Sequence, residues 1–462
     1  MAVAIDQHRG FKPFSRSQRC RLQSFGHLDP NIIEQLSQTR SSSTTFSHSF
    51  ELALQADNIH RSFSTPCLPI TTLSSGEDLT PHPPRIEVVR GSGASVYALV
   101  VEVAIAMASG AKPIPLPTGL GGAYVFVSPN GTNIAVAKPI DEEPLAINNP
   151  KGLGGQMLGQ PGLKKSIRVG ETGIRELAAY LLDHGGHAAV PPTALVKFSH
   201  APFFANAGAP SLPVPKIASL QRFVGHGFDA GELGPSFYSV ASVHQIGILD
   251  IRILNLDRHA GNMLVMKHDD IINNNSLVDG IIADLVPIDH GFCLPEWLDD
   301  PYFEWLHWPQ ASTPFSDSEL DYISKLDPFQ DAHVLRTEIP LLRESSVRVL
   351  IVCTILLKQA AAAGLCLADI GQMMTRKFSG GIELPSEMEN LCFNVKASIP
   401  CVSNINNEEE NDQQGGISLG DMNQGEWELF LDIFHELLHA AFEENKCKSR
   451  AKNNKKLEHH GC

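Results

Sequence analysis

A polar cluster between two apolar runs contains the residue types needed for proton transfer and metal binding. Asp257, His259 and Asn262 lie within Asp250–Met266, where the residues follow the order Asp-Arg-His-x-x-Asn. A carboxylate or an imidazole here could accept the proton of a hydroxyl group, and an amide oxygen could bind a hard cation such as Mg²⁺. The apolar run after Asn262 is expected to be a strand.

A second carboxylate follows another apolar run. Asp289 begins the sequence Asp-His-Gly at the end of this expected strand. An aspartate at such a place often only caps a turn, but with Asn262 upstream we expect the two side chains to bind Mg²⁺ together. Asp257 and Asn262 are five residues apart. The catalytic loop of protein kinases has the same Asp-to-Asn spacing, although its order is His-Arg-Asp.

Glycines precede a predicted β-hairpin in the segment Gly119–Lys138. Apolar residues alternate on both sides of Asn130-Gly131, and an Asn-Gly pair between two such runs is a strong hairpin signal. The glycines before the hairpin would allow backbone N–H groups to approach a phosphate group. Lys138 ends the second expected strand, where its ammonium group could reach the same phosphates. Alone the pattern is weak, because a lysine at a strand end is usually just solvated.

A helix is expected over Glu171–Asp183, whose apolar residues recur at helical spacing. Glu176 lies beside the apolar face rather than opposite it. The ordinary interpretation is a half-exposed glutamate, but Lys138 offers a candidate partner. We therefore predict an ion pair between Lys138 and Glu176 that directs the lysine towards nucleotide phosphates.

These features, taken in chain order, are the parts that phosphoryl transfer from ATP requires: a glycine loop, Lys138, Glu176, Asp257, Asn262 and Asp289. The loop is not a P-loop, because the sequence lacks GxxxxGK[ST]. It is not a dinucleotide-binding fingerprint either, since no helix is expected directly after the glycines. The sequence therefore predicts an enzyme that uses ATP and Mg²⁺, in which Asp257, or alternatively His259, meets the acceptor hydroxyl.

Length and composition limit the setting of this site. The chain has 462 residues, of which 43% are hydrophobic and 19% are charged, enough for a folded two-lobed enzyme with extensions. A net charge of −15 argues against a general nucleic-acid binder. The nine cysteines form no CxxC pair, so we expect reduced thiols in a cytoplasmic protein, with the nucleus left open. Two apolar runs, at 97–108 and 349–357, are too short for a membrane span and are expected to be buried helices.

Composition divides the chain into five segments. Residues 1–84 are rich in Ser, Thr and Pro and are expected to be disordered, although the start of this segment is also compatible with an organelle transit peptide. Residues 85–395 are expected to form the folded domain. An acidic linker is expected at 396–425, an amphipathic helix at 426–445 and a basic tail at 446–462. We expect the helix to pack on its own domain rather than on a partner or a membrane.

The Asp-Arg-His-x-x-Asn and Ile-Asp-His-Gly segments resemble those of the phosphatidylinositol 3-/4-kinase superfamily, and more closely those of the plant gamma group of type II phosphatidylinositol 4-kinases. The resemblance extends from about residue 95 to 380 and includes the C-terminal helix. Its main stretches are 137–144, 162–184, 190–194, 246–262, 287–296 and 301–306. It implies an α+β, two-lobed kinase-like fold: an N-lobe at about 112–222 with an antiparallel sheet and helices, and a mostly helical C-lobe at about 223–395.

The resemblance also implies which residues contact ATP. The segment 216–224 is similar to the last N-lobe strand and the hinge that holds adenine, and 287–312 is similar to an activation loop. Besides Lys138, Glu176 and Asp289, the residues expected to bind nucleotide are Gly121, Gly122, Ala123, Tyr124, Val125, Gln221, Arg222, Phe223 and Val224.

The activity that the resemblance implies is phosphorylation of phosphatidylinositol at the inositol 4-hydroxyl, which gives phosphatidylinositol 4-phosphate. A protein Ser/Thr kinase on the same fold is the alternative, and a non-catalytic binding module is disfavoured because the key residues are intact. Residues 289–330 contain one basic residue, Lys325, and many acids. That charge disfavours a headgroup that already carries monoester phosphates, but it admits either phosphatidylinositol or a protein segment.

Two departures from the family concern membrane binding and the N-terminus. The ubiquitin-like domains of some gamma members are not recognisable before residue 85, and the palmitoylated cysteine cluster of animal type II members has no counterpart. Stable membrane anchoring usually takes two signals. We therefore expect peripheral, reversible membrane contact at most.

Overall fold

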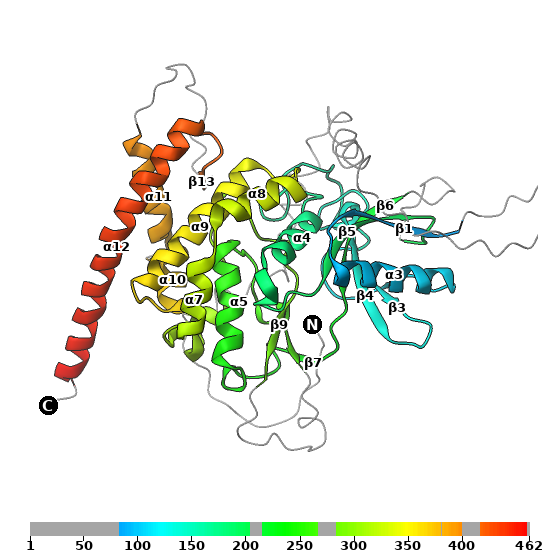
Figure 1. Ribbon diagram of the computed structural model, residues 1–462, viewed down its shortest axis with the longest axis horizontal. Coiled ribbons are helices and arrows are strands. Elements are labelled where there is room, and N and C mark those ends of the chain that lie inside the picture. The colour runs from blue at the N-terminus through cyan, green and yellow to red at the C-terminus, as the bar shows by residue number, and fades with distance from the viewer. Residues whose placement is uncertain (1–82, 204–214, 267–282, 380, 400–415, 460–462) are drawn as a thin grey trace, which may run out of the picture.

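The structure is a computed structural model, and it describes residues 83–203, 215–266, 283–379, 381–399 and 416–459. These residues form a mixed α+β molecule with a sheet-containing N-lobe and a largely helical C-lobe, as expected (Figure 1). The expectations of disorder or a transit peptide before residue 85 lie almost wholly outside the described residues.

The N-lobe is built on a six-stranded antiparallel sheet with the strand order β1-β5-β6-β4-β3-β2. Its strands are β1 (Arg85–Arg90), β2 (Ile114–Pro115), β3 (Tyr124–Val127), β4 (Asn133–Pro139), β5 (Thr193–Ser199) and β6 (Lys216–Arg222). The expected hairpin is β3–β4, and Asn130-Gly131 lies in its turn, where Gly131 has a φ of 87°. Only glycine adopts this backbone conformation without strain.

Two helices cover the two faces of the sheet. Helix α3 (Ala94–Ala108) packs with the side chains of one face into a small core, and α4 (Thr172–Leu182) joins the other face to the large core of the C-lobe. The sequence analysis expected the N-lobe to begin near residue 112, but in the structure it begins at β1. The reason is that β1 pairs with β5, a strand more than a hundred residues further along the chain.

The C-lobe is mainly helical and includes a small three-stranded sheet, β7-β8-β9, next to the N-lobe. The strands of the C-lobe as a whole are β7 (His226–Asp229), β8 (Met263–Met266), β9 (Leu285–Pro287), β10 (Trp297–Leu298), β11 (Lys377–Ser379), β12 (Ile382–Leu384) and β13 (Ile417–Ser418). Its helices are α5 (Val240–Arg252), α7 (Asp317–Lys325), α8 (Pro328–Glu338), α9 (Glu344–Ala362), α10 (Leu367–Met374), α11 (Glu387–Ser398) and α12 (Gln424–His459).

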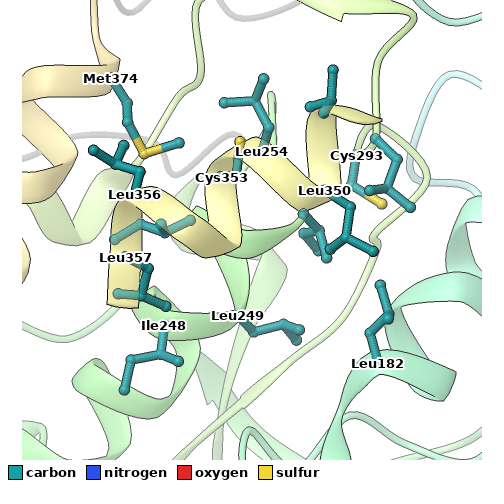
Figure 2. Close-up of a cluster of buried hydrophobic side chains, with 14 of the residues drawn as sticks. Leu182, Ile248, Leu249, Leu254, Cys293, Leu350, Cys353, Leu356, Leu357 and Met374 are labelled. Atoms are coloured by element: carbon teal, nitrogen blue, oxygen red, sulfur yellow. The ribbon is translucent and has the colours of Figure 1, made fainter. Parts of the chain in front are cut away.

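Helix α9 is the centre of the C-lobe core. Among the described helices it is long and apolar enough to cross a membrane by length and composition, but 83% of this stretch is buried inside the protein. Figure 2 shows side chains of α9 meeting those of α5, α4 and α10, among them Leu350, Leu356, Ile248, Leu249, Leu182 and Met374. The same core thus holds α5, which leads into the polar cluster, and α4, which carries Glu176.

The C-terminal segments differ from the expected boundaries. The acidic linker is shorter than 396–425, because β13 pairs with β10 and Leu419 is fully buried. The guanidinium of Arg348 holds this segment by donating to the carbonyls of Leu419 and Met422. The expected helix packs on α9 and α11 but continues as α12 to His459, through most of the basic tail. No Gly or Pro lies between Glu426 and His459, and Lys and Arg near a helix C-terminus favour the helical state.

Candidate active site

Strand pleating decides which side chains of the N-lobe sheet face the C-lobe. Lys138 on β4 pairs with Ser219 on β6, and these positions lie on the face covered by α4. Tyr124 and Arg222 have the opposite parity, so their side chains face α3. The guanidinium of Arg222 accordingly makes two bonds of 2.5 and 2.9 Å to Glu102 of α3. The expectation that Arg222 and Tyr124 bind nucleotide can therefore hold only for their backbones.

The predicted ion pair between Lys138 and Glu176 is present. Nζ of Lys138 lies 2.7 Å from Oε1 of Glu176 and 2.9 Å from Oδ1 of Asp289. Burial favours the neutral amine, but Asp289 and Glu176 together raise the pKa of Lys138 above its usual range. One ammonium group thus connects the N-lobe sheet, helix α4 and the segment after β9.

Glu176 is held as a buried carboxylate by two donors. Its side chain is 3% exposed; Oε1 accepts from Lys138, and Oε2 accepts from the backbone N–H of His290 at 3.0 Å. Burial would raise the pKa of Glu176, but Lys138 and His290 lower it overall. The imidazole of His290 is itself fully buried, and burial, with Arg258 nearby, lowers its pKa. The carboxylate is therefore ionised and the imidazole neutral near pH 7.

The antiparallel pairing of β8 and β9 brings the backbone of Asn262 next to that of Ile288, the residue before Asp289. Asn262 directly precedes β8 and Asp289 follows β9, and the N–H of Ile288 donates to the carbonyl of Asn262 at 3.0 Å. The side-chain NH₂ group of Asn262 donates to the carbonyl of Asp257 at 2.9 Å. This bond uses the nitrogen of the amide, so the oxygen Oδ1 is the atom that could bind a cation. Asp289 has a φ of 56°, a left-handed conformation that costs backbone energy, and its side chain is 51% exposed.

This pair of oxygen donors fits a magnesium ion better than a transition metal. Across the described residues, no group of three or more His, Cys, Asp or Glu side chains is placed to hold a metal ion. A cation at Asn262 and Asp289 would therefore take further ligands from nucleotide phosphates and water. Mg²⁺ is commonly bound in that way, through one or two protein oxygens.

A buried charge network beneath the polar cluster was not predicted from the sequence. Asp250 is fully buried at the end of α5 and accepts from Asn255, Trp305 and Nε of Arg258. Nη1 of Arg258 donates to the carbonyls of Asn262, a candidate metal ligand, and of Ile288, the residue before the other candidate ligand, Asp289. Arg258, the arginine of the Asp-Arg-His sequence, thus holds the backbone on both sides of the candidate site. The sequence signal that could have indicated this role is its position between Asp257 and His259.

The Asp250–Arg258 pair leads to a prediction for stability. Arg258→Ala leaves Asp250 buried without its cation, so we expect the free energy of unfolding to fall by about 3–5 kcal/mol. Arg336→Ala is the matched control, because Arg336 pairs with Glu344 at the surface and such pairs contribute about 0–1 kcal/mol. Urea denaturation of both variants measures the difference. Equal destabilisation by the two substitutions would contradict the network.

Asp257 directly precedes Arg258 in the chain, and it is partly buried. Burial raises the pKa of Asp257 to about 6; His259 opposes this shift and Asp289 adds to it. His259 and Asp289 therefore lie close enough to Asp257 to influence its ionisation. A carboxylate with a raised pKa is suited to accept a proton near neutral pH.

The glycine loop connects β2 to β3 and is anchored by an acid that the sequence analysis overlooked. The N–H of Gly122 donates to the carbonyl of Glu142 at 2.8 Å, and a Cβ atom at Gly122 would lie 2.1 Å from Oε2 of Glu142. Glu142 is fully buried and accepts from the hydroxyl of Tyr124 at 2.6 Å and from Lys216 at 2.9 Å. Gly122 is therefore required by packing, whereas Gly121 and Ala123 remain backbone candidates for phosphate contact. Val125 pairs with Val136, which has the same parity as Lys138, so it remains a nucleotide-binding candidate through its side chain.

The expected hinge is the segment that joins the two lobes after β6. The side chain of Gln221 donates to Thr193 at 2.9 Å, and the N–H of Phe223 donates to the carbonyl of Ile134 at 3.0 Å. The carbonyl of Val224 lies 2.9 Å from Nδ1 of His226. The segment 221–224 thus continues from β6, the strand that pairs with β4 and therefore lies next to Lys138.

Comparisons with known proteins agree with this geometry. A sequence model described as phosphatidylinositol 3- and 4-kinase matches residues 121–370. Phosphatidylinositol 4-kinase gamma 1 of Arabidopsis thaliana is 60% identical over 405 residues, which cover 86% of this chain and 69% of that protein. Phosphatidylinositol 4-kinase gamma 8 of the same plant is 59% identical over 404 residues, 86% of this chain and 73% of that protein. The chain therefore belongs to the phosphatidylinositol 3- and 4-kinase family, in its plant gamma group.

Proposed function

We propose that this kinase transfers the γ-phosphoryl group of ATP to the inositol 4-hydroxyl of phosphatidylinositol. The observation that supports the transfer most strongly is the position of Lys138 between Glu176 and Asp289, at 2.7 and 2.9 Å. This geometry connects the lobes and points an ammonium group into the site where phosphates would lie. The lipid acceptor and the ring position rest on the names of the relatives, which are phosphatidylinositol 4-kinases.

The chain's own residues would hold the nucleotide as follows. The hinge at 221–224 would receive adenine, backbone N–H groups of the glycine loop would face the phosphates, and Lys138 would neutralise charge on them. Asn262 and Asp289 would hold magnesium, which when bound neutralises charge on the β- and γ-phosphates. The network of Asp250 and Arg258 holds the backbone of Asn262 and of Ile288, the residue before Asp289.

Asp257 would hold the acceptor hydroxyl in line with the γ-phosphorus and accept its proton. The bond from Asn262 to the carbonyl of Asp257 fixes the distance between the metal-binding and proton-accepting parts of the loop. His259, next along the loop, is the alternative base. The acceptor lies at a membrane surface, so the enzyme would act in the cytoplasm as a peripheral protein.

Several acids of the activation-loop segment are bonded to other protein groups and so give little information about the acceptor. Glu296 makes bonds of 2.6 and 3.0 Å to Arg168, Asp299 accepts from Ser166, and the N–H of Arg376 donates to Asp300. These carboxylates stabilise the fold rather than face a substrate. Local charge therefore disfavours neither a lipid nor a protein acceptor.

An assay with two acceptors tests the proposal. Purified full-length protein would be given labelled ATP and magnesium with phosphatidylinositol vesicles or with a generic protein substrate. We expect label in the lipid at a rate well above that in the protein. Label in the protein alone would instead support the alternative, a protein Ser/Thr kinase.

The raised pKa of Asp257 predicts how activity depends on pH. The carboxyl group accepts a proton only when it is ionised, so kcat/KM for Mg·ATP should fall as the pH drops through about 6. An ordinary aspartate would hold its activity down to about pH 4. A profile of kcat/KM against pH measures this acidic fall, because kcat/KM reports the ionisation of groups in the free enzyme. If the fall persists in Asp257→Asn and is lost in His259→Ala, then His259 is the base.

Removal of the metal tests the pair formed by Asn262 and Asp289. Asn262 and Asp289 would hold Mg²⁺, which would neutralise charge on the phosphates, so chelation with EDTA should weaken ATP binding by roughly tenfold or more. Asp289→Ala should weaken binding in the presence of Mg²⁺ and lose most of the difference between the two conditions. Fluorescence titration with a nucleotide analogue measures both. Equal wild-type affinity with EDTA and with magnesium would show that the metal site is wrongly assigned.

A further inference from the structure

A two-stranded hairpin in the C-lobe exposes large apolar side chains. Phe378 on β11 is 71% exposed and Ile382 on β12 is 66% exposed, and Leu384 is also exposed. The two strands pair with each other and form a separate two-stranded sheet. Phe393, on the neighbouring helix α11, is exposed as well. Isolated exposed apolar residues are ordinary, but a group of large ones marks an interaction site.

Both faces of this hairpin carry apolar side chains. The register pairs Phe378 with Glu383 on one face, and Ser379 with Ile382 and Lys377 with Leu384 on the other. A single flat protein surface could cover one of these faces but not both. A fluid apolar medium that surrounds the tip could cover both at once. This arrangement favours a lipid bilayer over a protein partner.

Contacts link the hairpin to the catalytic loop. The N–H of Arg376, directly before β11, donates to Oδ1 of Asp300 at 2.7 Å. Two residues later, the carbonyl of Tyr302 accepts from the N–H of Arg258 at 3.0 Å. The base of the hairpin is thus connected through the activation-loop segment to the loop that carries Asp257.

The base of the hairpin is rigid. Arg376 makes three bonds of 2.7 to 3.1 Å to the carboxylate of Glu389, and Lys377 pairs with Glu387 at 2.8 Å; both acids are on α11. Arg376 also lies 3.6 Å from Glu383 of β12, so both basic residues at the base of the hairpin are paired with acids. The contact with a membrane should therefore depend on apolar area rather than on anionic lipid.

We propose that the β11–β12 hairpin inserts its apolar tip into the surface of the bilayer and holds the C-lobe against the membrane. The inference deepens the proposed function, because a lipid acceptor requires such a contact. Insertion would be shallow, within the headgroup and upper acyl region, since unpaired backbone groups at the strand edges need polar partners. Phe378 and Ile382, nearest the turn, would enter furthest.

Vesicle binding by the full-length protein tests the hairpin without relying on activity. Phe378→Ser combined with Ile382→Ser should weaken sedimentation with vesicles of phosphatidylcholine and phosphatidylinositol by roughly tenfold or more, from the lost apolar burial. Ile105→Ser is the matched control, because Ile105 is exposed to a similar degree on α3 of the N-lobe and should leave binding unchanged. Raising the salt concentration should change wild-type binding little. Equal binding by the hairpin variant and the wild type would overturn the proposal.

Activity on two forms of the same lipid separates the hairpin from the catalytic site. With monomeric short-chain phosphatidylinositol, the hairpin variant should match the wild type; with vesicles it should fall in parallel with its binding. Loss of activity on both forms would place the hairpin in the catalytic machinery and overturn its role as a membrane contact. A wild type inactive on both forms would overturn the lipid acceptor, while vesicle binding would still decide the hairpin. Unchanged vesicle binding with weakened phosphorylation of a protein would assign the hairpin to protein docking instead.

Discussion

Asp257→Asn is expected to lower kcat by about 10²–10⁴-fold and to leave Mg·ATP affinity nearly unchanged. The amide has the same shape as the carboxylate but cannot accept the hydroxyl proton. ATP affinity depends on other groups: Lys138, the hinge, and the pair formed by Asn262 and Asp289. Steady-state kinetics with the acceptor, together with a nucleotide titration, would measure the two quantities separately.

The control for this variant is His259→Ala, which removes the neighbouring imidazole and leaves the carboxylate. If Asp257 is the base, this change should cost activity far less than Asp257→Asn does. Turnover close to that of the wild type in Asp257→Asn would remove the assignment. A larger loss in His259→Ala would transfer the role to the histidine.

Lys138→Met should lower kcat by about 10²–10³-fold, which is the usual cost of removing one charge-stabilising donor. The methionine retains an unbranched apolar stem one atom shorter than lysine but cannot neutralise the phosphates. Glu176 keeps the N–H of His290 as a donor, so we expect the N-lobe to remain folded. Activity assays, with a thermal melt to check folding, measure the effect.

Two further variants distinguish catalysis from general charge effects. Glu176→Gln should lose less activity than Lys138→Met, since a neutral amide can still accept a hydrogen bond from the lysine. Lys325→Met should have almost no effect, because Lys325 pairs with Asp321 at an exposed site on α7. Full activity in Lys138→Met would contradict the site.

The local parts of the site were predictable from the sequence. The hairpin β3–β4, helix α4 and strand β8 each show a short-range pattern: Asn-Gly between alternating apolar runs, helical spacing, and an apolar run after Asn262. The pairing of Lys138 with Glu176 was predictable because pattern and resemblance agreed. The hairpin, the helix and the strand depend on residues that are near one another in the chain, whereas Lys138 and Glu176 are 38 residues apart.

The parts that depend on distant contacts were not predictable. The pairing of β1 with β5 extends the N-lobe to Arg85, and no local pattern in the first strand identifies that partner. The guanidinium of Arg222 turns towards α3 because strand parity, fixed by the pairing of β4 with β6, places it on that face. Glu142 and Asp250 appear in the sequence as ordinary acids. Their roles follow from burial, which single-sequence patterns do not report.

The phosphate position on the lipid product tests the central claim most directly. Full-length enzyme would label phosphatidylinositol from ATP, and the product would be deacylated and separated by chromatography from the 3- and 5-phosphate isomers. We predict label in the 4-phosphate isomer, reduced to background in both Lys138→Met and Asp257→Asn. Label in another isomer or in protein alone would contradict the account. So would label in the lipid that is undiminished in these two variants.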